Sequence, residues 1–133
     1  MRNNKLSVAV HIICLIEKLS ASGHVVISDF IAGSVNINPA SVRRIIPVLT
    51  KSEIIYKSNG YQISHFKKLT LYDVLKSVDY DNHLFYPHTN SNLQCPVGSE
   101  IEGKMLKIYS GLEKNLDNEL KEIKLSEIIQ SFK

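Results

Sequence analysis

Residues 38–49 constrain the fold more than any other stretch, because they specify both the start of a helix and the side of it that is buried. Asn38 can accept a hydrogen bond from a free amide as N-cap, and Pro39 suits the first helical position because the amide there has no partner to lose. The apolar residues that follow recur every three to four positions along one stripe: Val42, Ile45, Ile46 and Leu49. We therefore predict a well-defined helix that Pro47 kinks.

The outer side of this helix carries small, polar and cationic residues: Ala40, Ser41, Arg43 and Arg44. Small side chains at a helix start let a DNA backbone come close, and the free amides there favour phosphate. Arginines on the same side can bind phosphates or guanine edges. The pattern predicts a DNA-recognition helix, and Asn38 and Pro39 at its start are further candidate DNA contacts. A surface helix with two solvated arginines is the alternative.

The chain before this helix supplies two further elements. Residues 6–20 have helix length and an apolar centre nearly all round, so we expect a helix buried on most sides. In a protein this small, such a helix also contacts a second subunit, and we place Ile12 in that interface. Residues 25–27 are β-branched, which predicts a short strand.

A short helix is expected between that strand and the recognition helix. Ser28 is its candidate N-cap and a candidate DNA contact, and the helix covers residues 29–34 with Phe30 and Ile31 facing inward. Residues 35–37 make the turn into the next helix. Two helices joined by a tight turn, the second with a cationic outer face, compose a helix-turn-helix.

The next segment predicts a β-hairpin. Residues 54–57 and 61–64 are two short apolar runs separated by Ser58-Asn59-Gly60, and Asn-Gly is a strong hairpin turn because both residues tolerate positive φ. A hairpin directly after a recognition helix is a wing. Its polar and basic residues are candidate DNA contacts: Lys57, Asn59, Lys67 and Lys68. An ordinary solvated hairpin is the alternative.

The last part of the chain predicts a loop between two helices. Thr70 and Asp73 form a capping box that opens a helix through about residue 78. Residues 79–98 show no periodicity and are interpreted as a loop. A long helix and a short helix over 124–129 follow. The long helix carries apolar residues at three- or four-residue spacing: Ile101, Met105, Ile108, Leu112, Leu116, Leu120 and Ile123.

The stripe from Ile101 to Ile123 is too long for this small domain to cover, so we interpret it as a dimer interface, with intramolecular packing as the alternative. We place Ile101, Met105, Ile108, Leu112 and Leu116 in that interface. The predicted fold is mainly α with a small β wing. Residues 1–80 form a winged helix-turn-helix DNA-binding domain, 81–99 a loop, and 100–133 the dimerisation helix with a short C-terminal helix.

Length and charge agree with this assignment. The 133 residues suit one domain, and 44% apolar residues suffice for a modest core. Residues 1–70 hold nine basic and three acidic residues, a net charge of +6, so the remainder carries −3. A basic front joined to an acidic part fits nucleic-acid binding. No apolar run is long enough to span a membrane and no signal-peptide pattern begins the chain, so we expect a cytoplasmic protein with no membrane partner.

The order of these parts resembles the bacterial Rrf-two family of winged-helix regulators over almost the whole chain. The matching segments are residues 6–16, 42–45, 69–75 and the long final helix. Residues 95–98, Cys-Pro-Val-Gly, are similar to the segment before the dimer helix in a cluster-free, YwnA-like subgroup. The resemblance implies a homodimer that binds a palindromic operator in double-stranded DNA. Cluster-binding relatives have three cysteines in this loop where the chain has only Cys95, so we expect no cofactor.

The two cysteines differ in setting. Cys14 lies among aliphatic residues and is interpreted as inert packing. Cys95 lies in a loop close before a helix, where it is either a thiol sensor or part of the domain surface. A thiol enzyme using Cys95 with His83 or His88 is an alternative, but no oxyanion-stabilising turn is evident. A helical dimer that binds only protein leaves the cationic helix face unexplained. We therefore predict a DNA-binding regulator, a repressor, and not an enzyme.

Overall fold

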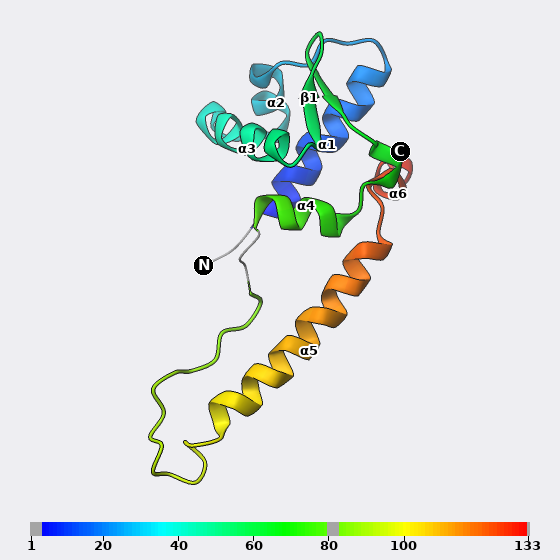
Figure 1. The fold of residues 1–133 in the computed structure, drawn as a ribbon. Coiled ribbons are helices and arrows are strands. Elements are labelled where there is room, and N and C mark those ends of the chain that lie inside the picture. The colour runs from blue at the N-terminus through cyan, green and yellow to red at the C-terminus, as the bar shows by residue number, and fades with distance from the viewer. Residues whose placement is uncertain (1–3, 80–82, 133) are drawn as a thin grey trace.

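A computed structural model describes residues 4–79 and 83–132, and it divides into a body and an arm (Figure 1). The body contains α1 (Lys5–Ala21), α2 (Ser28–Val35), α3 (Pro39–Lys51), β1 (Ile55–Lys57), β2 (Tyr61–Ile63), the 3₁₀ turn η1 (Phe66–Lys68), α4 (Leu71–Val78) and α6 (Leu125–Gln130). The arm is α5 (Ile101–Glu122) together with the loop that precedes it. The predicted fold class, mainly helical with a small two-stranded wing and a long helix near the C-terminus, is confirmed.

The core of the body is built around α1. Ala9, Ile12, Ile13 and Ile16 of this helix have no exposed surface. They pack with fully buried aliphatic residues from every neighbouring element of the body, among them Ile31, Val42, Leu49, Ile55, Val74 and Leu125. Each fully buried aliphatic side chain stabilises the fold by about 1.5–3 kcal/mol. The apolar centre of residues 6–20 therefore packs mainly against residues of its own chain.

The region around α2 departs from the sequence prediction in three places. Ile27, not Ser28, is the N-cap, and Ser28 is the first helical residue. Ile31 is fully buried as predicted, but Phe30 is 53% exposed: neighbouring helix positions point about 100° apart, and in α2 the buried side carries Ile31 and Ala32, not Phe30. Residues 25–27 form no strand. A single backbone hydrogen bond, from Tyr61 N–H to the carbonyl of Val26, joins them to the hairpin, and a ladder needs repeated bonds.

The hairpin has the predicted turn. Asn59 and Gly60 both have positive φ, 54° and 89°, and β1 pairs antiparallel with β2 so that Lys57 lies opposite Tyr61. A Cβ on Gly60 would lie 2.8 Å from the backbone nitrogen of Val26. Glycine is therefore required here twice, for its φ and for the close approach of the two backbones.

The C-terminal residues return to the body and anchor α5 there. The predicted capping box is present: the Thr70 side chain accepts from Asp73 N–H, and the Asp73 carboxylate accepts from Thr70 N–H at 3.0 Å. Next to it, Leu71 N–H donates to the carbonyl of Ile123 at 2.9 Å and Leu125 N–H to that of Leu69 at 3.0 Å. The start of α4 is thus tied to the end of α5.

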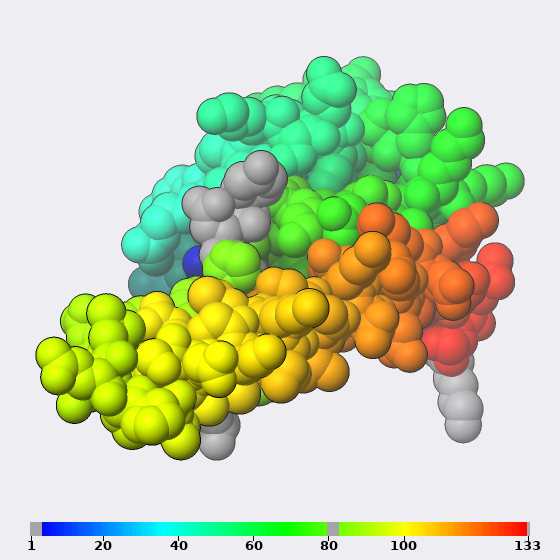
Figure 2. All heavy atoms as spheres, turned by 60° about the horizontal axis from the view of Figure 1, so that its bottom comes forward, coloured from blue at the N-terminus to red at the C-terminus, as the bar shows by residue number. Residues whose placement is uncertain are grey.

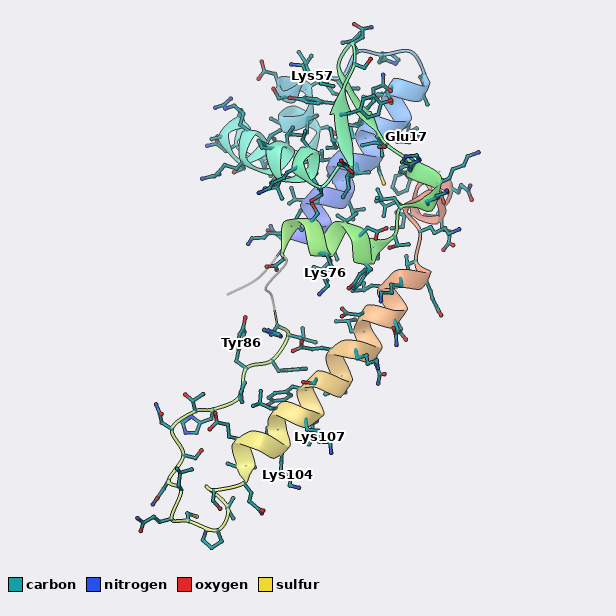
Figure 3. All side chains as sticks on the ribbon, viewed as in Figure 1. Glu17, Lys57, Lys76, Tyr86, Lys104 and Lys107 are labelled. Carbon is teal, nitrogen blue, oxygen red and sulfur yellow. The ribbon has the colours of Figure 1, made fainter. Side chains whose placement is uncertain are left out.

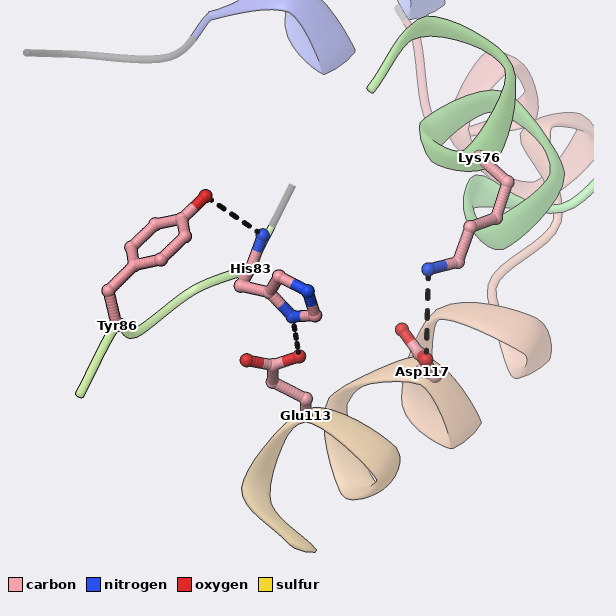
Figure 4. A network of polar contacts seen from close by, with 5 residues as sticks. All are labelled: Lys76, His83, Tyr86, Glu113 and Asp117. Atoms are coloured by element: carbon pink, nitrogen blue, oxygen red, sulfur yellow. Dashed lines mark hydrogen bonds and ion pairs between the residues drawn. The ribbon is translucent and has the colours of Figure 1, made fainter. Parts of the chain in front are cut away.

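The arm leaves the body at this anchor and is contacted by α4 along its last turns. Lys76 Nζ lies 3.9 Å from a carboxylate oxygen of Asp117 (Figure 4). The ring of Tyr72 lies under two ammonium groups, 5.4 Å from Lys76 and 4.5 Å from Lys121. Figure 2 shows the remaining turns of α5 projecting beyond the body. All of α5 is described, and only Leu120 in it is buried.

The predicted loop runs back beside α5. His83 Nδ1 lies 2.9 Å from a carboxylate oxygen of Glu113 (Figure 4), and the ring of Phe85 stacks on Tyr109 with centroids 5.1 Å apart. Lys104 and Lys107 project from α5 away from this loop (Figure 3). None of the helices within residues 4–79 and 83–132 has the length and apolar character needed to cross a membrane.

Candidate nucleic-acid interface

The start of α3 has the predicted geometry. Asn38 is the N-cap and its side-chain oxygen accepts from Ala40 N–H at 2.8 Å, while Pro39 occupies the first helical position. Val42, Ile46 and Leu49 are buried and hold the helix against the core. The helix continues through Pro47 to Lys51 as one element. Its first turns are thereby presented at the surface of the body (Figure 1).

The outer face of α3 is cationic, and its arginines form no ion pair within the described residues. Arg43 and Arg44 are exposed, and Ala40 and Ser41 are half-buried beside them. A guanidinium nitrogen of Arg44 donates to the Ser41 hydroxyl at 3.2 Å. Across residues 4–79 and 83–132, no carboxylate lies within ion-pair distance of either arginine. Both positive charges are therefore available to an external anion.

The wing brings only part of the predicted basic set near α3. Lys57, at the end of β1, and Asn59, in the turn, are exposed, and Figure 3 shows Lys57 on the wing, at the end of the body away from α5. Lys67 and Lys68 lie instead on η1, which contacts α6 across the body from the start of α3 (Figure 1). Ser28 is half-buried at the first position of α2.

A hollow of about 440 Å³ adjoins the recognition helix, and nothing in the local sequence predicts it. One wall comes from α3, with Ser41 and Arg44 among its residues, and the others from the start of α1, the turn before α3 and Val78 of α4. Four separate segments meet here, so only the tertiary fold reveals the site. A second, apolar groove of about 570 Å³ runs along α1, and its aliphatic and aromatic lining includes Leu6, Val10, Leu15, Leu19, Leu71 and Phe132.

The predicted dimer residues fall into two groups. Ile101, Ile108, Leu112 and Leu116 form an exposed apolar stripe on α5, and Met105 beside them is half-buried. Ile12, by contrast, is fully enclosed by its own chain, so no surface of it is free to meet a second subunit. The exposed residues of α1 that line the apolar groove are Ser7, His11 and Lys18.

Cys95 is exposed in the turn before α5, whereas Cys14 is buried in α1. The backbone N–H groups of Gly98 and, to a lesser degree, Val97 hydrogen-bond the sulfur and hold the pKa of Cys95 below the ordinary thiol value. Burial raises the pKa of Cys14. The two cysteines thus differ in both access and acidity.

Comparison with known proteins decides the family. A family model described as "Iron-dependent Transcriptional regulator", Rrf2, matches residues 2–131. The chain belongs to the Rrf2 (Rrf-two) family. It is a DNA-binding transcription regulator with a winged helix-turn-helix, and its family consists of regulators rather than enzymes. The resemblance drawn from the sequence is therefore confirmed.

Individual relatives support the assignment. The chain is 35% identical over 136 residues to YwnA of Bacillus subtilis (strain 168), described as a candidate helix-turn-helix-type transcriptional regulator, and the match covers 97% of each chain. The crystal structure of a candidate DNA-binding protein is 28% identical with a TM-score of 0.75, covering 94% of this chain and 98% of the other. T. potens IscR, at 12% identity and a TM-score of 0.69 over 98% of this chain and 86% of the other, shares the fold.

The family description mentions iron, but the side chains of this chain do not supply a set of ligands for it. Residues 83–100 contain one cysteine, and the other is enclosed in α1. In the described ranges 4–79 and 83–132, no three His, Cys, Asp or Glu side chains are arranged to hold a metal ion. An iron-sulfur cluster takes up to four such ligands, so the residues present do not form a site for one.

Proposed function

We propose that the protein is a homodimeric repressor that binds a palindromic operator through α3. The observation that carries this is the outer face of α3, where Arg43 and Arg44 lie at a capped helix start without an acidic partner in the described residues. A helix with these residues on its first turns can enter a major groove and bind guanine through a bidentate arginine. The proposal places the protein in the cytoplasm, where a bacterial regulator meets its operator.

The exposed stripe of α5 supports the dimer. Leu112 is 48% exposed and Ile108 54%, and a continuous apolar stripe of this kind on a soluble chain marks an interaction surface. We propose that a second copy of the chain covers this stripe. The stripe and the α1 groove of that copy are the matching apolar surfaces of a twofold interface. Residues 100–133 are thus proposed as the dimerisation part and residues 1–80 as the DNA-binding part.

The dimer gives the operator its symmetry. Two copies of α3 related by a twofold axis read two half-sites with centres one helical turn or a multiple of it apart. Ser41, Arg43 and Arg44 are proposed to contact bases, with Ser28, Asn38, Pro39 and Ala40 near the backbone. Lys57 and Asn59 on the wing are proposed to contact phosphates. The position of Lys67 and Lys68 beside α6 makes them the weakest members of the predicted set.

The test uses an operator selected from genomic fragments and measured by fluorescence anisotropy at several salt concentrations. Arg43→Ala should cost about 1–3 kcal/mol at the operator and relax the preference at one base pair. Lys57→Ala should weaken specific and scrambled duplexes alike and flatten the salt dependence. Lys67→Ala and Lys68→Ala are matched controls for charge. Unchanged specific binding in the double variant Arg43→Ala, Arg44→Ala would contradict this assignment of the reading face.

The lowered pKa and exposure of Cys95 favour a thiol-responsive form of the same function. The amides of Gly98 and Val97 lower the pKa of the Cys95 thiol, which favours the thiolate that reacts with oxidants and electrophiles, and the residue lies shortly before α5. We propose that its modification changes operator affinity through the arm. N-ethylmaleimide, which adds to a single thiolate through its activated double bond, should then weaken operator binding by the native protein and leave Cys95→Ser unaffected. Equal responses of the two proteins would exclude Cys95 as the sensor.

A further inference from the structure

The hollow beside α3 belongs to one flank of the recognition helix. Ser41, Arg44, Ile45 and Val48 follow helical spacing and face the start of α1, whereas Arg43 is not part of this flank. Figure 1 shows the start of α1 and the end of α4 next to each other below α3. Five aliphatic side chains form the wall: Val8, Ile37, Ile45, Val48 and Val78. The two arginines of α3 therefore have different surroundings.

The rim of the hollow is positively charged. Lys5 lines it and lies 4.0 Å from a carboxylate oxygen of Asp79, so its charge is already opposed. Arg44 has no carboxylate within ion-pair distance among residues 4–79 and 83–132, and the Ser41 hydroxyl is neutral. A guanidinium at the mouth of an aliphatic hollow is complementary to a molecule with one carboxylate and an alkyl chain.

We propose that this hollow binds a small aliphatic monocarboxylate, and that its binding weakens the affinity for operator DNA. The carboxylate accepts N–H groups of Arg44, and the alkyl chain lies on the aliphatic wall. A volume of about 440 Å³ lies in the range of small-molecule sites, which are mostly apolar with a few polar groups that fix orientation. A DNA phosphate would use Arg44 but leave that wall uncovered.

The effect on DNA rests on the proposed function, because Arg44 is one of the residues proposed to contact the operator. One guanidinium cannot satisfy a ligand carboxylate and a guanine edge in the same geometry. The two ligands therefore compete, and by linkage operator DNA lowers carboxylate affinity by the same factor as the carboxylate lowers DNA affinity.

The first experiment measures ligand binding without DNA, by heteronuclear NMR titration with butyrate, hexanoate and octanoate. Saturable shifts should appear around the hollow, with affinity rising by up to about fourfold for each added methylene, since each buried methylene contributes about 0.8 kcal/mol. Hexylammonium, with the same chain and opposite charge, should not bind. No saturation by octanoate, or equal binding of hexylammonium, would overturn the proposal.

Two neighbouring arginines provide the matched variants. Arg44→Gln should reduce octanoate affinity at least tenfold, whereas Arg43→Gln, one position away and also exposed, should retain it. Val48→Phe places a bulky ring on the aliphatic wall of the hollow without changing charge and should also abolish binding. Circular dichroism checks that each variant is folded. Equal octanoate affinity in Arg44→Gln and the native protein would overturn the assignment of the carboxylate to Arg44.

The second experiment adds the operator and separates this inference from the proposed function. Octanoate should weaken operator binding by the native protein severalfold, while Val48→Phe should bind the operator normally and not respond to octanoate. An equal response of Val48→Phe would show that the effect does not pass through the hollow and would overturn the coupling. Saturable octanoate binding by a protein that binds no DNA would contradict the proposed function and leave the ligand site supported.

Discussion

Helices α3 and α5 carry the same apolar spacing but opposite degrees of exposure. In α3 the residues Val42 and Leu49 are fully buried by the body. In α5 the equivalent stripe includes Ile108 and Leu112, which remain about half exposed. A three-to-four spacing indicates that a helix has an apolar side, but it does not indicate what covers that side.

The difference between the two helices comes from chain connectivity. Helix α3 is joined by short turns to α2 and β1, so neighbouring elements close over its stripe. Helix α5 follows a long loop and is anchored to the body near its end, by the backbone bonds around Leu71 and Leu125 and by the contacts of Tyr72 and Lys76. The apolar side chains on the earlier turns of α5 therefore need a packing partner outside the body. In the proposed function, a second copy supplies it.

The largest expected effect is in the body. Leu49→Asp places a charge where Leu49 has no exposed surface and no cation to pair with. An uncompensated buried charge costs several kcal/mol, a large part of the roughly 5–15 kcal/mol that stabilises a domain. We expect the variant to be unfolded by circular dichroism, while Leu49→Met stays folded because it nearly conserves volume. A cooperatively folded Leu49→Asp would show that α3 is not held by this stripe.

The same substitution in the arm should act differently. Leu112→Asp lies on an exposed stripe, so the chain should stay folded and lose only its dimer. Light scattering should give a mass near 15.0 kDa for this variant and about twice that for the native protein. Lys114→Asp, two positions along the same helix, is the control for added negative charge. A native protein that is monomeric at micromolar concentration would refute the proposed dimer.

Features that depend on residues within one or two turns were predictable from the sequence. The Asn38 cap, the Asn59-Gly60 turn and the Thr70–Asp73 capping box each involve groups at most three residues apart, and all three are present. Their hydrogen bonds form wherever the local backbone allows, so no knowledge of the rest of the fold is needed.

Features that depend on the three-dimensional arrangement were not predictable. Phe30 and Ile31 are both apolar, and the packing of α2 against α1 and α3 decides that Ile31 is the buried one. Lys67 and Lys68 follow the wing in sequence, but the chain turns toward α6 before it reaches them. The hollow beside Arg44 combines four segments, and no periodicity in one of them indicates it.

The two cysteines extend the comparison between body and arm to reactivity. The pKa of Cys95 is lowered by the amides of Gly98 and Val97, so its alkylation rate should rise at lower pH than in the unfolded chain. The pKa of Cys14 is raised by burial, which lowers its thiolate fraction, and only 4% of the residue is exposed. At pH 7 we expect iodoacetamide to modify Cys95 at least tenfold faster than Cys14, as measured by mass spectrometry. Similar rates would mean that α1 opens readily in solution.

The smallest effect is expected where body and arm join. Thr70 caps α4 and also forms a β-bridge with Lys124, immediately after α5. Thr70→Ala removes the side-chain acceptor for Asp73 N–H, a loss that costs about 0.5–2 kcal/mol at an N-cap. Urea denaturation should report this decrease in the free energy of unfolding.

Thr50→Ala is the matched control, because the Thr50 hydroxyl donates to the carbonyl of Ile46 within α3 and caps no helix. This bond goes to a carbonyl in the interior of a helix and satisfies no free group at a helix end. Its loss should therefore change the free energy of unfolding by less than about 0.5 kcal/mol. If Thr70→Ala is no more destabilising than Thr50→Ala, the backbone bonds of Leu71 and Leu125 and the contacts of Tyr72 and Lys76 hold the junction without the capping box. The capping box would then set only the start of α4, and the attachment of the arm would not depend on it.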